Sequence, residues 1–227
     1  MFLFFGVPGS GIGTFNSQIC HEFGLTRISL TEELRKIKEG NDYHIFSPKL
    51  VDSIRNSLLI GRASDEVFMR VLESKMNEKE TTKGASIDGF PRSWKQFENF
   101  EYNYSLDLAI HLIVDDCILV EAMLGRRVCS KCHKSYNICH IERNGYKLIP
   151  LLPKKKGICD VCGSILQSKA EDNVHTIVTR IDRYKKVSEK MVDHLYKNYK
   201  ILEFAPKRGI NDMEFLINEI KNRIAFI

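Results

Sequence analysis

Short apolar runs alternate with stretches of helical spacing along most of the chain. Residues 1–5 and 108–114 are the clearest apolar runs, and residues 84–88 form a shorter one that ends in an acid. The stretches with helical spacing are residues 15–23, 49–60, 64–77 and 115–124, with a further helix start at 31–35 and a brief strand at 26–29. Strands and helices that alternate at this spacing predict a parallel sheet covered by helices on both faces.

The pattern breaks over residues 125–167, which carry five of the seven cysteines, Gly145, Pro150 and Pro153. We interpret this stretch as an inserted, mobile, β-rich subdomain. After it, residues 170–199 have helical spacing, with Val187 as the place where a break would fall. A last strand at 199–205 and a closing helix capped by Asn211-Asp212 complete the expected order.

The first apolar run leads directly into Gly6-Val7-Pro8-Gly9-Ser10-Gly11-Ile12-Gly13-Thr14. A strand that enters a glycine-rich turn and then a helix can wrap phosphates, because backbone N–H groups and the helix N-terminus stabilise negative charge. The general phosphate-loop pattern is G-x-x-x-x-G-K-[ST]. Gly6 and Gly11 fit it, but Ile12 occupies the lysine position and Gly13 the hydroxyl position. An ordinary strand-to-helix turn is the alternative.

A second motif, Asp88-Gly-Phe-Pro-Arg92, follows the run at 84–88. Carboxyl ends of parallel strands share one edge of a sheet, so this motif is expected beside the glycine-rich turn. There Asp88 can hold a water ligand of Mg²⁺, and the guanidinium of Arg92 can donate two hydrogen bonds to a phosphate. Alone, the motif would equally fit a β-turn with a surface arginine.

The cysteines include two C-x-x-C pairs, Cys129/Cys132 and Cys159/Cys162. Four thiolates in this spacing predict a closed tetrahedral site for structural Zn²⁺. Iron, disulfides or an empty hydrogen-bonded cluster are the alternatives, and Cys139 and His140 are competing ligands without paired spacing. Cys20 and Cys117 lie in helical patterns and are expected in the core.

Length, charge and apolar content limit the kinds of protein that this chain can be. The chain has 227 residues, 43% of them hydrophobic, and a net charge of +5. This length fits one core domain with one or two inserted subdomains. Apart from Lys154 to Lys156 the basic residues are dispersed, so phosphate-bearing small molecules are favoured over nucleic-acid polymers. No run approaches the about 18 apolar residues of a membrane span, and a soluble, intracellular protein is expected.

Together these motifs resemble the adenylate kinase family, in its long-lid, zinc-bearing form, over essentially the whole chain. The matching motifs are Gly6 to Thr14, Leu34-Arg35, Ser64-Asp-Glu66, Asp88 to Arg92 with Gln96, Gly125-Arg-Arg127, Cys159-Asp-Val-Cys-Gly163, Lys169-Ala-Glu-Asp-Asn173 and Arg180-Ile-x-x-Tyr184. The resemblance implies an α/β fold of the P-loop NTPase type, with a doubly wound, five-stranded parallel sheet, an inserted helical NMP-binding region and a β-rich zinc LID. The implied division is a CORE domain at 1–28, 61–125 and 166–227, an AMP-binding insert at 29–60 and a LID at 126–165.

The reaction implied is reversible, Mg²⁺-dependent transfer of the γ-phosphoryl group of ATP to AMP by a monomeric, cytoplasmic enzyme, with an organelle left open. By resemblance, the ATP-binding residues are Gly9, Ser10, Gly11, Ile12, Gly13, Thr14 and Arg126. The AMP-binding residues are Leu30, Arg35, Gly89, Arg92, Gln96, Lys169 and Arg180. The catalytic set is Asp88, Arg92, Arg126, Lys169 and Arg180, with Cys129, Cys132, Cys159 and Cys162 as metal ligands.

The chain also departs from the family pattern, mainly on the ATP side. Ile12 replaces the loop lysine, Ala122 replaces a common arginine at the adenine, Leu30 stands where a threonine usually touches AMP, and Glu171 replaces an aspartate of the lid hinge. Reduced activity is therefore expected, with Lys154 to Lys156 as a substitute cation. The alternatives are a catalytically inactive protein that binds nucleotide or a protein partner, and a phosphotransferase that uses GTP.

Overall fold

The structure is a computed structural model that describes residues 1–39, 47–59 and 64–224. It consists of two compact units. Unit 1 comprises Met1–Gly6, Ile12–His111 and Val187–Glu203, and unit 2 comprises Val7–Gly11, Leu112–Lys186 and Phe204–Ile227. The predicted division into CORE, AMP-binding insert and LID cuts the chain at other places and stays a prediction.

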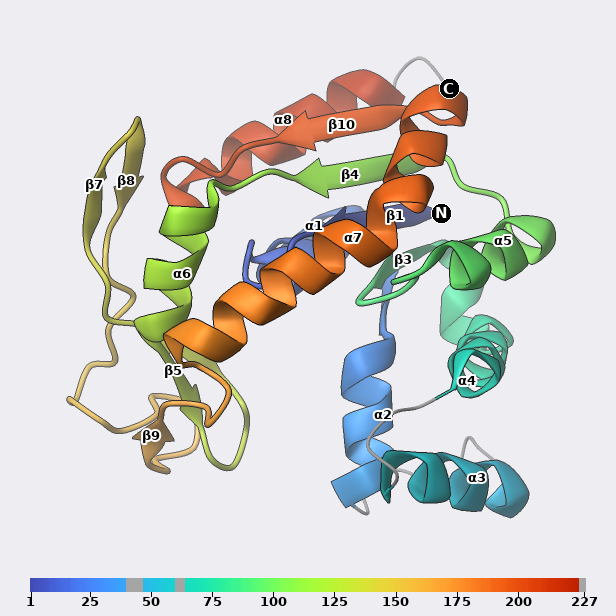
Figure 1. Ribbon diagram of the computed structural model, residues 1–227, viewed down its shortest axis with the longest axis horizontal. Coiled ribbons are helices and arrows are strands. Elements are labelled where there is room, and N and C mark those ends of the chain that lie inside the picture. The colour runs from blue at the N-terminus through green and yellow to red at the C-terminus, as the bar shows by residue number, and fades with distance from the viewer. Residues whose placement is uncertain (40–46, 60–63, 225–227) are drawn as a thin grey trace. The chain divides into compact units, whose positions relative to one another are not determined.

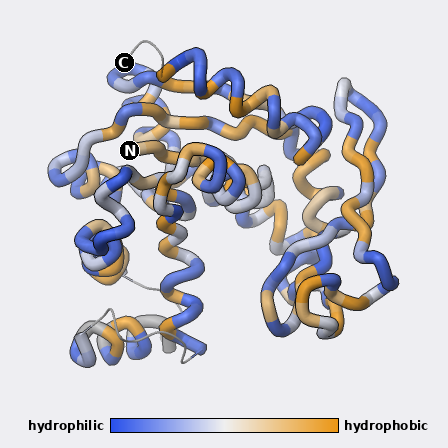
Figure 2. Tube along the Cα trace, turned by 180° about the vertical axis from the view of Figure 1, so that it is seen from behind, coloured by the Kyte–Doolittle hydropathy of each residue, from blue (hydrophilic) through white to orange (hydrophobic). Residues whose placement is uncertain are grey.

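Unit 1 is built on a five-stranded parallel sheet, as the sequence predicts (Figure 1). The strand order is β10-β4-β1-β3-β2. The strands are β1 (Phe2–Gly6), β2 (Thr26–Ser29), β3 (Ala85–Asp88), β4 (Leu108–Leu112) and β10 (Ile201–Phe204). Every residue of β1 and β3 is buried, and β1 is accordingly apolar from Phe2 to Phe5, whereas β3 carries the buried polar residues Ser86 and Asp88 (Figure 2).

Helices cover this sheet and form the rest of unit 1. They are α1 (Ile12–Phe23), α2 (Leu30–Glu39), α3 (Pro48–Leu59), α4 (Asp65–Met76), the 3₁₀ turn η1 (Lys79–Lys83) and α5 (Trp94–Asn103). The Ser64 and Ser93 side chains accept hydrogen bonds from Val67 N and Gln96 N, so serines cap α4 and α5. The end of the helix predicted over 49–60 lies outside the described residues.

The core of unit 1 brings strand residues together with aromatic side chains of α5. Phe97 and Phe100 are almost fully buried and contact each other, with ring centroids 6.2 Å apart. Leu3, Ile28 and Ile87 from three neighbouring strands belong to the same cluster. This packing fixes the carboxyl ends of β1, β2 and β3 relative to one another, which is the edge where ligands bind in such sheets.

Unit 2 contains the β-rich segment that the sequence predicts, together with helical elements and the first part of α7 (Val174–Asn198), whose last part belongs to unit 1. Its elements are α6 (Asp116–Leu124), β5 (Arg126–Cys129), β6 (Ser135–Asn137), β7 (Ile141–Arg143), β8 (Tyr146–Leu148), β9 (Leu166–Gln167), η2 (Gly209–Asp212) and α8 (Met213–Ile224). Strands β6, β5 and β9 form one antiparallel sheet, and β7 pairs with β8 in a hairpin.

Three details differ from the sequence-based expectations. Helix α7 (Val174–Asn198) is continuous, so the break near Val187 is absent. The helix also begins later than residue 170, because Asn173 caps it by accepting a hydrogen bond from Thr176 N. Cys117 was expected in the core and is exposed on α6, whereas Cys20 is buried. Among the described residues, the helices are too short or too polar to cross a membrane.

Candidate functional site

The glycine-rich turn adopts the conformation that its glycines allow. Gly9 and Gly11 have φ values of +103° and +93°, and Ser10 N donates to Val7 O at 3.1 Å. Val7 anchors the turn in unit 2 by packing on the cluster of Leu119, Met123, Ile177 and Ile181. The turn continues into α1, whose first residue is Ile12.

One side chain of the turn has an unsatisfied polar atom. Ser10 is 5% exposed, and its Oγ makes no hydrogen bond within the described chain. A buried hydroxyl without a partner is uncommon and marks a place where a ligand oxygen can bind. Together with the following helix N-terminus, the turn therefore retains the means to hold an anion.

A side chain at Gly9 would collide with Met123 of α6. A Cβ atom there would lie 2.5 Å from Met123 Sδ and 2.8 Å from Met123 Cγ, and the positive φ adds strain. For a non-glycine residue the left-handed region costs about 1–2 kcal/mol.

Gly9→Ala is therefore expected to weaken ATP binding at least about tenfold, equivalent to about 1.4 kcal/mol, because the turn must shift away from α6. Isothermal titration with ATP measures this effect. Gly145→Ala is the matched control, since Gly145 also has a positive φ but has no atom within 4 Å of its Cβ position. Equal ATP affinities of Gly9→Ala and the unsubstituted protein would contradict this role of the turn.

Asp88 lies at the end of β3, but its carboxylate is already occupied by protein donors. Asp88 is 4% exposed. Its Oδ2 accepts from Asn16 Nδ2 and Arg27 Nε, both at 2.8 Å, and its Oδ1 accepts from Ser29 Oγ at 2.7 Å. A carboxylate offers about four lone-pair sites, so three are in use.

This arrangement bears on the expected Mg²⁺. A hydrated Mg²⁺ needs free carboxylate oxygens to receive hydrogen bonds from its water ligands. Here the guanidinium of Arg27 lies against Asp88 and reaches Glu32 as well. As arranged, Asp88 does not fit the predicted role of organising the metal.

The Asp88-to-Arg92 turn forms a network with the start of α5. Arg92 Nε donates to Gly89 O at 2.7 Å, and Arg92 N donates to Gln96 Oε1 at 2.7 Å. Gln96 Nε2 in turn donates to Asp65 Oδ1 at 2.7 Å, which ties α5 to the start of α4. The structure thus brings together three of the predicted AMP-binding residues, Gly89, Arg92 and Gln96.

Two other predicted AMP-binding residues lie on α2. Leu30 is fully buried in the hydrophobic core of unit 1, so its side chain serves packing. Arg35 is half-buried, and its Nε is buried without a hydrogen-bond partner in the described chain, at 3.8 Å from Glu39 Oε1. An unsatisfied guanidinium nitrogen is suited to a phosphate oxygen.

In unit 2, the predicted phosphate-clamping residues are partly engaged. Arg126 forms a two-bond fork with the buried Asp172 carboxylate, at 2.9 Å from Nε and 2.5 Å from Nη2. Lys169 Nζ lies 3.8 Å from Glu171 Oε1, and Arg180 is half-buried on α7. The roles of these three side chains stay predictions.

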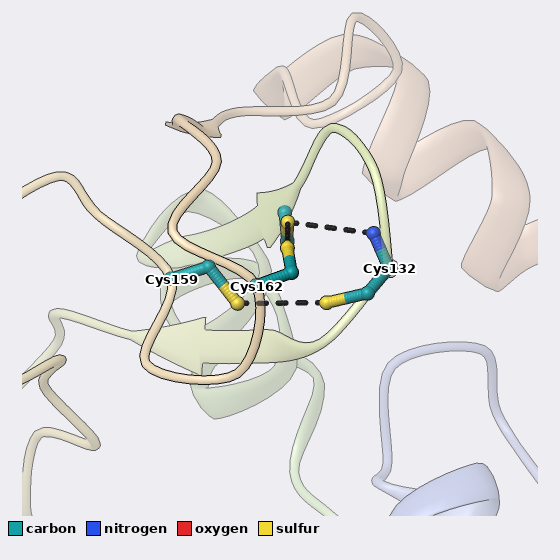
Figure 3. Close-up of side chains that lie close together, drawn as sticks. Cys132, Cys159 and Cys162 are labelled. Carbon is teal, nitrogen blue, oxygen red and sulfur yellow. Dashed lines mark hydrogen bonds between the residues drawn. The ribbon is translucent and has the colours of Figure 1, made fainter.

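The four paired cysteines converge in unit 2 (Figure 3). Their Sγ atoms all lie within 4.8 Å of one another. Cys129 Sγ is 3.3 Å from Cys162 Sγ, and Cys132 Sγ is 3.5 Å from Cys159 Sγ. Among the described residues, the cluster includes neither Cys139 nor His140, which removes them as competing ligands in this structure.

The two cysteine turns have matching backbones. His133 N donates to Cys129 O and Gly163 N to Cys159 O, and both donors have positive φ values, +59° and +72°. Lys131 N and Val161 N each point at the first sulfur of their own turn, at 3.4 Å. Backbone N–H groups aimed at sulfur stabilise thiolates, so the donor set fits a tetrahedral Zn²⁺.

Within the described ranges, no histidine side chain belongs to the cysteine cluster, and neither does the lysine run. His111 stacks on Phe5 with centroids 4.4 Å apart and its Nδ1 lies 2.7 Å from Tyr196 Oη. Burial lowers the pKa of His111, although Glu203 opposes this effect, so its role is structural. Lys154 to Lys156 are exposed on unit 2.

Sequence reasoning missed the residues around Asp88. Asn16 and Ser86 are fully buried polar residues, and Ser86 Oγ donates to Asn16 Oδ1 at 2.5 Å. Arg27 completes the group from β2. The signal for Arg27 was a charged residue inside a short strand of a parallel sheet, where apolar residues are the rule.

The fold and the turn define a nucleotide-binding protein of the P-loop class: a glycine-rich turn joins the first strand of a five-stranded parallel sheet to a helix. The family model described as adenylate kinase matches residues 4–200. The chain therefore belongs to the adenylate kinase family. It is a phosphotransferase of the nucleoside monophosphate kinase type, as the resemblance of the sequence implied.

Individual relatives agree with this assignment. The chain is 32% identical over 210 residues to an adenylate kinase of Geobacillus sp. (strain WCH70), covering 90% of this chain and 85% of that protein. It is 30% identical over 213 residues to an adenylate kinase of Acetivibrio thermocellus, covering 91% of each. It is 30% identical over 216 residues to adenylate kinase 1, chloroplastic, of Arabidopsis thaliana, covering 92% of this chain and 72% of that protein.

Proposed function

We propose that this chain transfers the γ-phosphoryl group of ATP to AMP at a reduced rate. In this step the bond between the γ-phosphorus and the β,γ-bridging oxygen breaks, and a bond to an AMP phosphate oxygen forms, which gives two ADP. The observation that carries the proposal is the retained turn, with Ser10 Oγ unsatisfied ahead of the N-terminus of α1. Membership of the adenylate kinase family supports the choice of substrates.

The protein's contribution is positioning and charge stabilisation, since phosphoryl transfer needs little covalent chemistry from the enzyme. Residues Gly9 to Thr14 receive the ATP phosphates through backbone N–H groups. Arg35 and Arg92 hold the AMP phosphate, and Gln96 orients the turn that carries Arg92 through its hydrogen bond to Arg92 N. Arg126, Lys169 and Arg180 supply positive charge from the LID and its hinge.

The reduced rate follows from Ile12. This residue is half-buried at the first position of α1 and cannot donate a hydrogen bond to the β- and γ-phosphate oxygens. Loss of one charge-stabilising donor from a preorganised site costs about 2.7–4 kcal/mol, or two to three orders of magnitude in rate.

Structural Zn²⁺ belongs to the same proposal. Cys129, Cys132, Cys159 and Cys162 would hold it, and four thiolates leave no open coordination position for chemistry. The metal supplies folding energy to the segment of residues 126–165. We assign this segment as the LID and residues 29–60 as the AMP-binding insert, in a monomeric protein.

A coupled assay with ATP and AMP tests the activity. The expected kcat is at least about two orders of magnitude below the typical 1–100 s⁻¹ of kinases, but measurable above a blank without enzyme. If Lys154 to Lys156 supply the missing charge, their joint replacement by alanine abolishes this turnover. Parallel titrations with ATP and GTP show which nucleotide is the phosphate donor. The missing adenine contact at Ala122 is the argument for GTP.

An inactive nucleotide-binding protein is the second candidate, and Ile12 favours it. The two candidates predict the same ATP binding by calorimetry but different turnover. No ADP formation above the blank, together with ATP binding, would establish the second. Absence of both binding and turnover would contradict both.

A further inference from the structure

A single arginine, Arg27, lies between two carboxylates at the carboxyl edge of the sheet. Its Nε donates to Asp88 Oδ2 at 2.8 Å. Its Nη1 and Nη2 donate to Glu32 Oε2 and Oε1, at 3.0 and 2.9 Å. All three residues belong to unit 1 and come from β2, β3 and the first turn of α2.

The sheet register explains how Arg27 reaches this position. In the parallel pair β2–β3, Arg27 lies opposite Ser86 and Ser29 lies opposite Asp88. Side chains two residues apart in a strand share one face of the sheet. Arg27 therefore extends along the same face as Ser29 and places its guanidinium beside Asp88, two residue pairs further along.

The guanidinium also lies beside the first turn of the helix that follows the glycine-rich turn. A Cβ atom on Gly13 would be 3.2 Å from Arg27 Nη2. Residue 13 follows Ile12, where the phosphate-loop pattern has its lysine. The chain thus lacks a cation on the loop itself but has one against the backbone of the next residue.

The surroundings of Arg27 favour its positively charged form. Burial by itself disfavours the charge, but the carboxylates of Asp88 and Glu32 outweigh it and raise the pKa of Arg27. Two carboxylates converging from different elements would otherwise make an electronegative site suited to a hydrated divalent cation. Arg27 occupies the space between them with a fixed positive charge instead.

We propose that Arg27 is a resident cation of the phosphate site, held between Asp88 and Glu32, and that it lets this chain bind nucleoside triphosphates without a divalent metal. The inference rests on the proposed nucleotide binding, and it specifies that the bound ligand is the metal-free nucleoside triphosphate. Without Arg27, the two carboxylates would repel the triphosphate unless a metal ion lay between them. If Arg27 served only as a structural ion pair, its removal would not make triphosphate binding depend on a metal ion.

The test is isothermal titration of the full chain with ATP, once in excess EDTA and once in excess MgCl₂. We expect the two dissociation constants of the unsubstituted protein to agree within about threefold, since the site has its own cation. Arg27→Gln is expected to bind ATP at least about tenfold more weakly in EDTA and to recover most of this loss in MgCl₂. Arg27→Lys, which keeps the charge, should stay within about fivefold of the unsubstituted protein in EDTA.

Mn²⁺ alone provides a readout that needs no nucleotide. Water-proton relaxation should detect weak or no Mn²⁺ binding to the unsubstituted protein and tighter binding to Arg27→Gln, because Glu32 and Asp88 then have no cation between them and Asp88 keeps only its neutral donors Asn16 and Ser29. Arg70→Gln is the matched control, since Arg70 also pairs with a carboxylate but does so at the surface, with Glu66 within α4. Circular dichroism verifies that each variant is folded.

ATP binding by the unsubstituted protein that strengthens tenfold or more with MgCl₂ would overturn this inference and leave the proposed function standing. This comparison requires no variant, so it decides even if Arg27→Gln does not fold. Equal metal dependence of Arg27→Gln and Arg70→Gln would also overturn it. Absence of ATP binding in both buffers would remove the proposed function along with the inference.

Discussion

Replacing Ile12 with lysine is expected to raise kcat with ATP and AMP by about two to three orders of magnitude. The backbone of the turn already has its glycines in the required conformation, with Gly9 and Gly11 at positive φ. A lysine at the first residue of α1 would add an ammonium donor for the transferring phosphate without reshaping the turn. The measurement is initial-rate kinetics in the coupled assay.

Ile12→Met is the control for Ile12→Lys, because it adds a long unbranched side chain without charge. It should leave kcat unchanged within about threefold, since shape alone supplies no donor for the phosphate oxygens. A gain below tenfold for Ile12→Lys would show that a loss other than the lysine limits the rate. Ala122 and Glu171 would then be the next positions to revert.

Cys159→Ser is expected to remove the metal and to unfold the segment around the cysteine cluster. Immediately around the cysteines the hydrophobic core is small, with Cys129, Tyr136 and Cys159 as its buried members, while Ile141 and Tyr146 pack separately on Ile118. Zinc binding contributes about 10–16 kcal/mol in zinc-finger peptides, far more than three buried side chains can provide. Metal content per chain should therefore fall from about one to near zero, and limited proteolysis should cut within residues 130–165.

Cys117→Ser is the matched control, since Cys117 is an exposed cysteine on α6 outside the cluster. It should retain its metal and its resistance to protease. Full metal content in Cys159→Ser would contradict four-thiolate binding. A metal-free unsubstituted protein that resists protease would indicate the empty, hydrogen-bonded cluster instead.

The residues that could be predicted from the sequence are those whose role depends on local spacing. The glycines of the turn, the strand runs around them and the two C-x-x-C pairs each act through near neighbours in the chain. Periodicity predicted the parallel sheet for the same reason, because buried strands are mostly apolar on both faces, and the family resemblance implied its five strands. The continuous α7 was harder, since the residue pattern near Val187 does not reveal that packing supports the helix there.

The surroundings of Asp88 could not be predicted in this way. Asp88 is 61 residues from Arg27 in the chain, and the register of β2 against β3 brings the two together, whereas Glu32 follows Arg27 by only 5 residues. Spacing suggested that Asp88 faces a metal, and the structure shows its oxygens accepting from Asn16, Arg27 and Ser29. A role assigned by motif thus depends on neighbours that the motif does not include.

The closeness of the sulfur atoms has a practical consequence for anyone who purifies this protein. The shortest Sγ–Sγ approaches, 3.3 and 3.5 Å, both join a cysteine of one turn to a cysteine of the other. Thiols so near each other can oxidise in air, and the resulting cross-links would block later metal uptake. Preparations kept under reductant with zinc present from lysis onward should differ in activity and homogeneity from those handled aerobically.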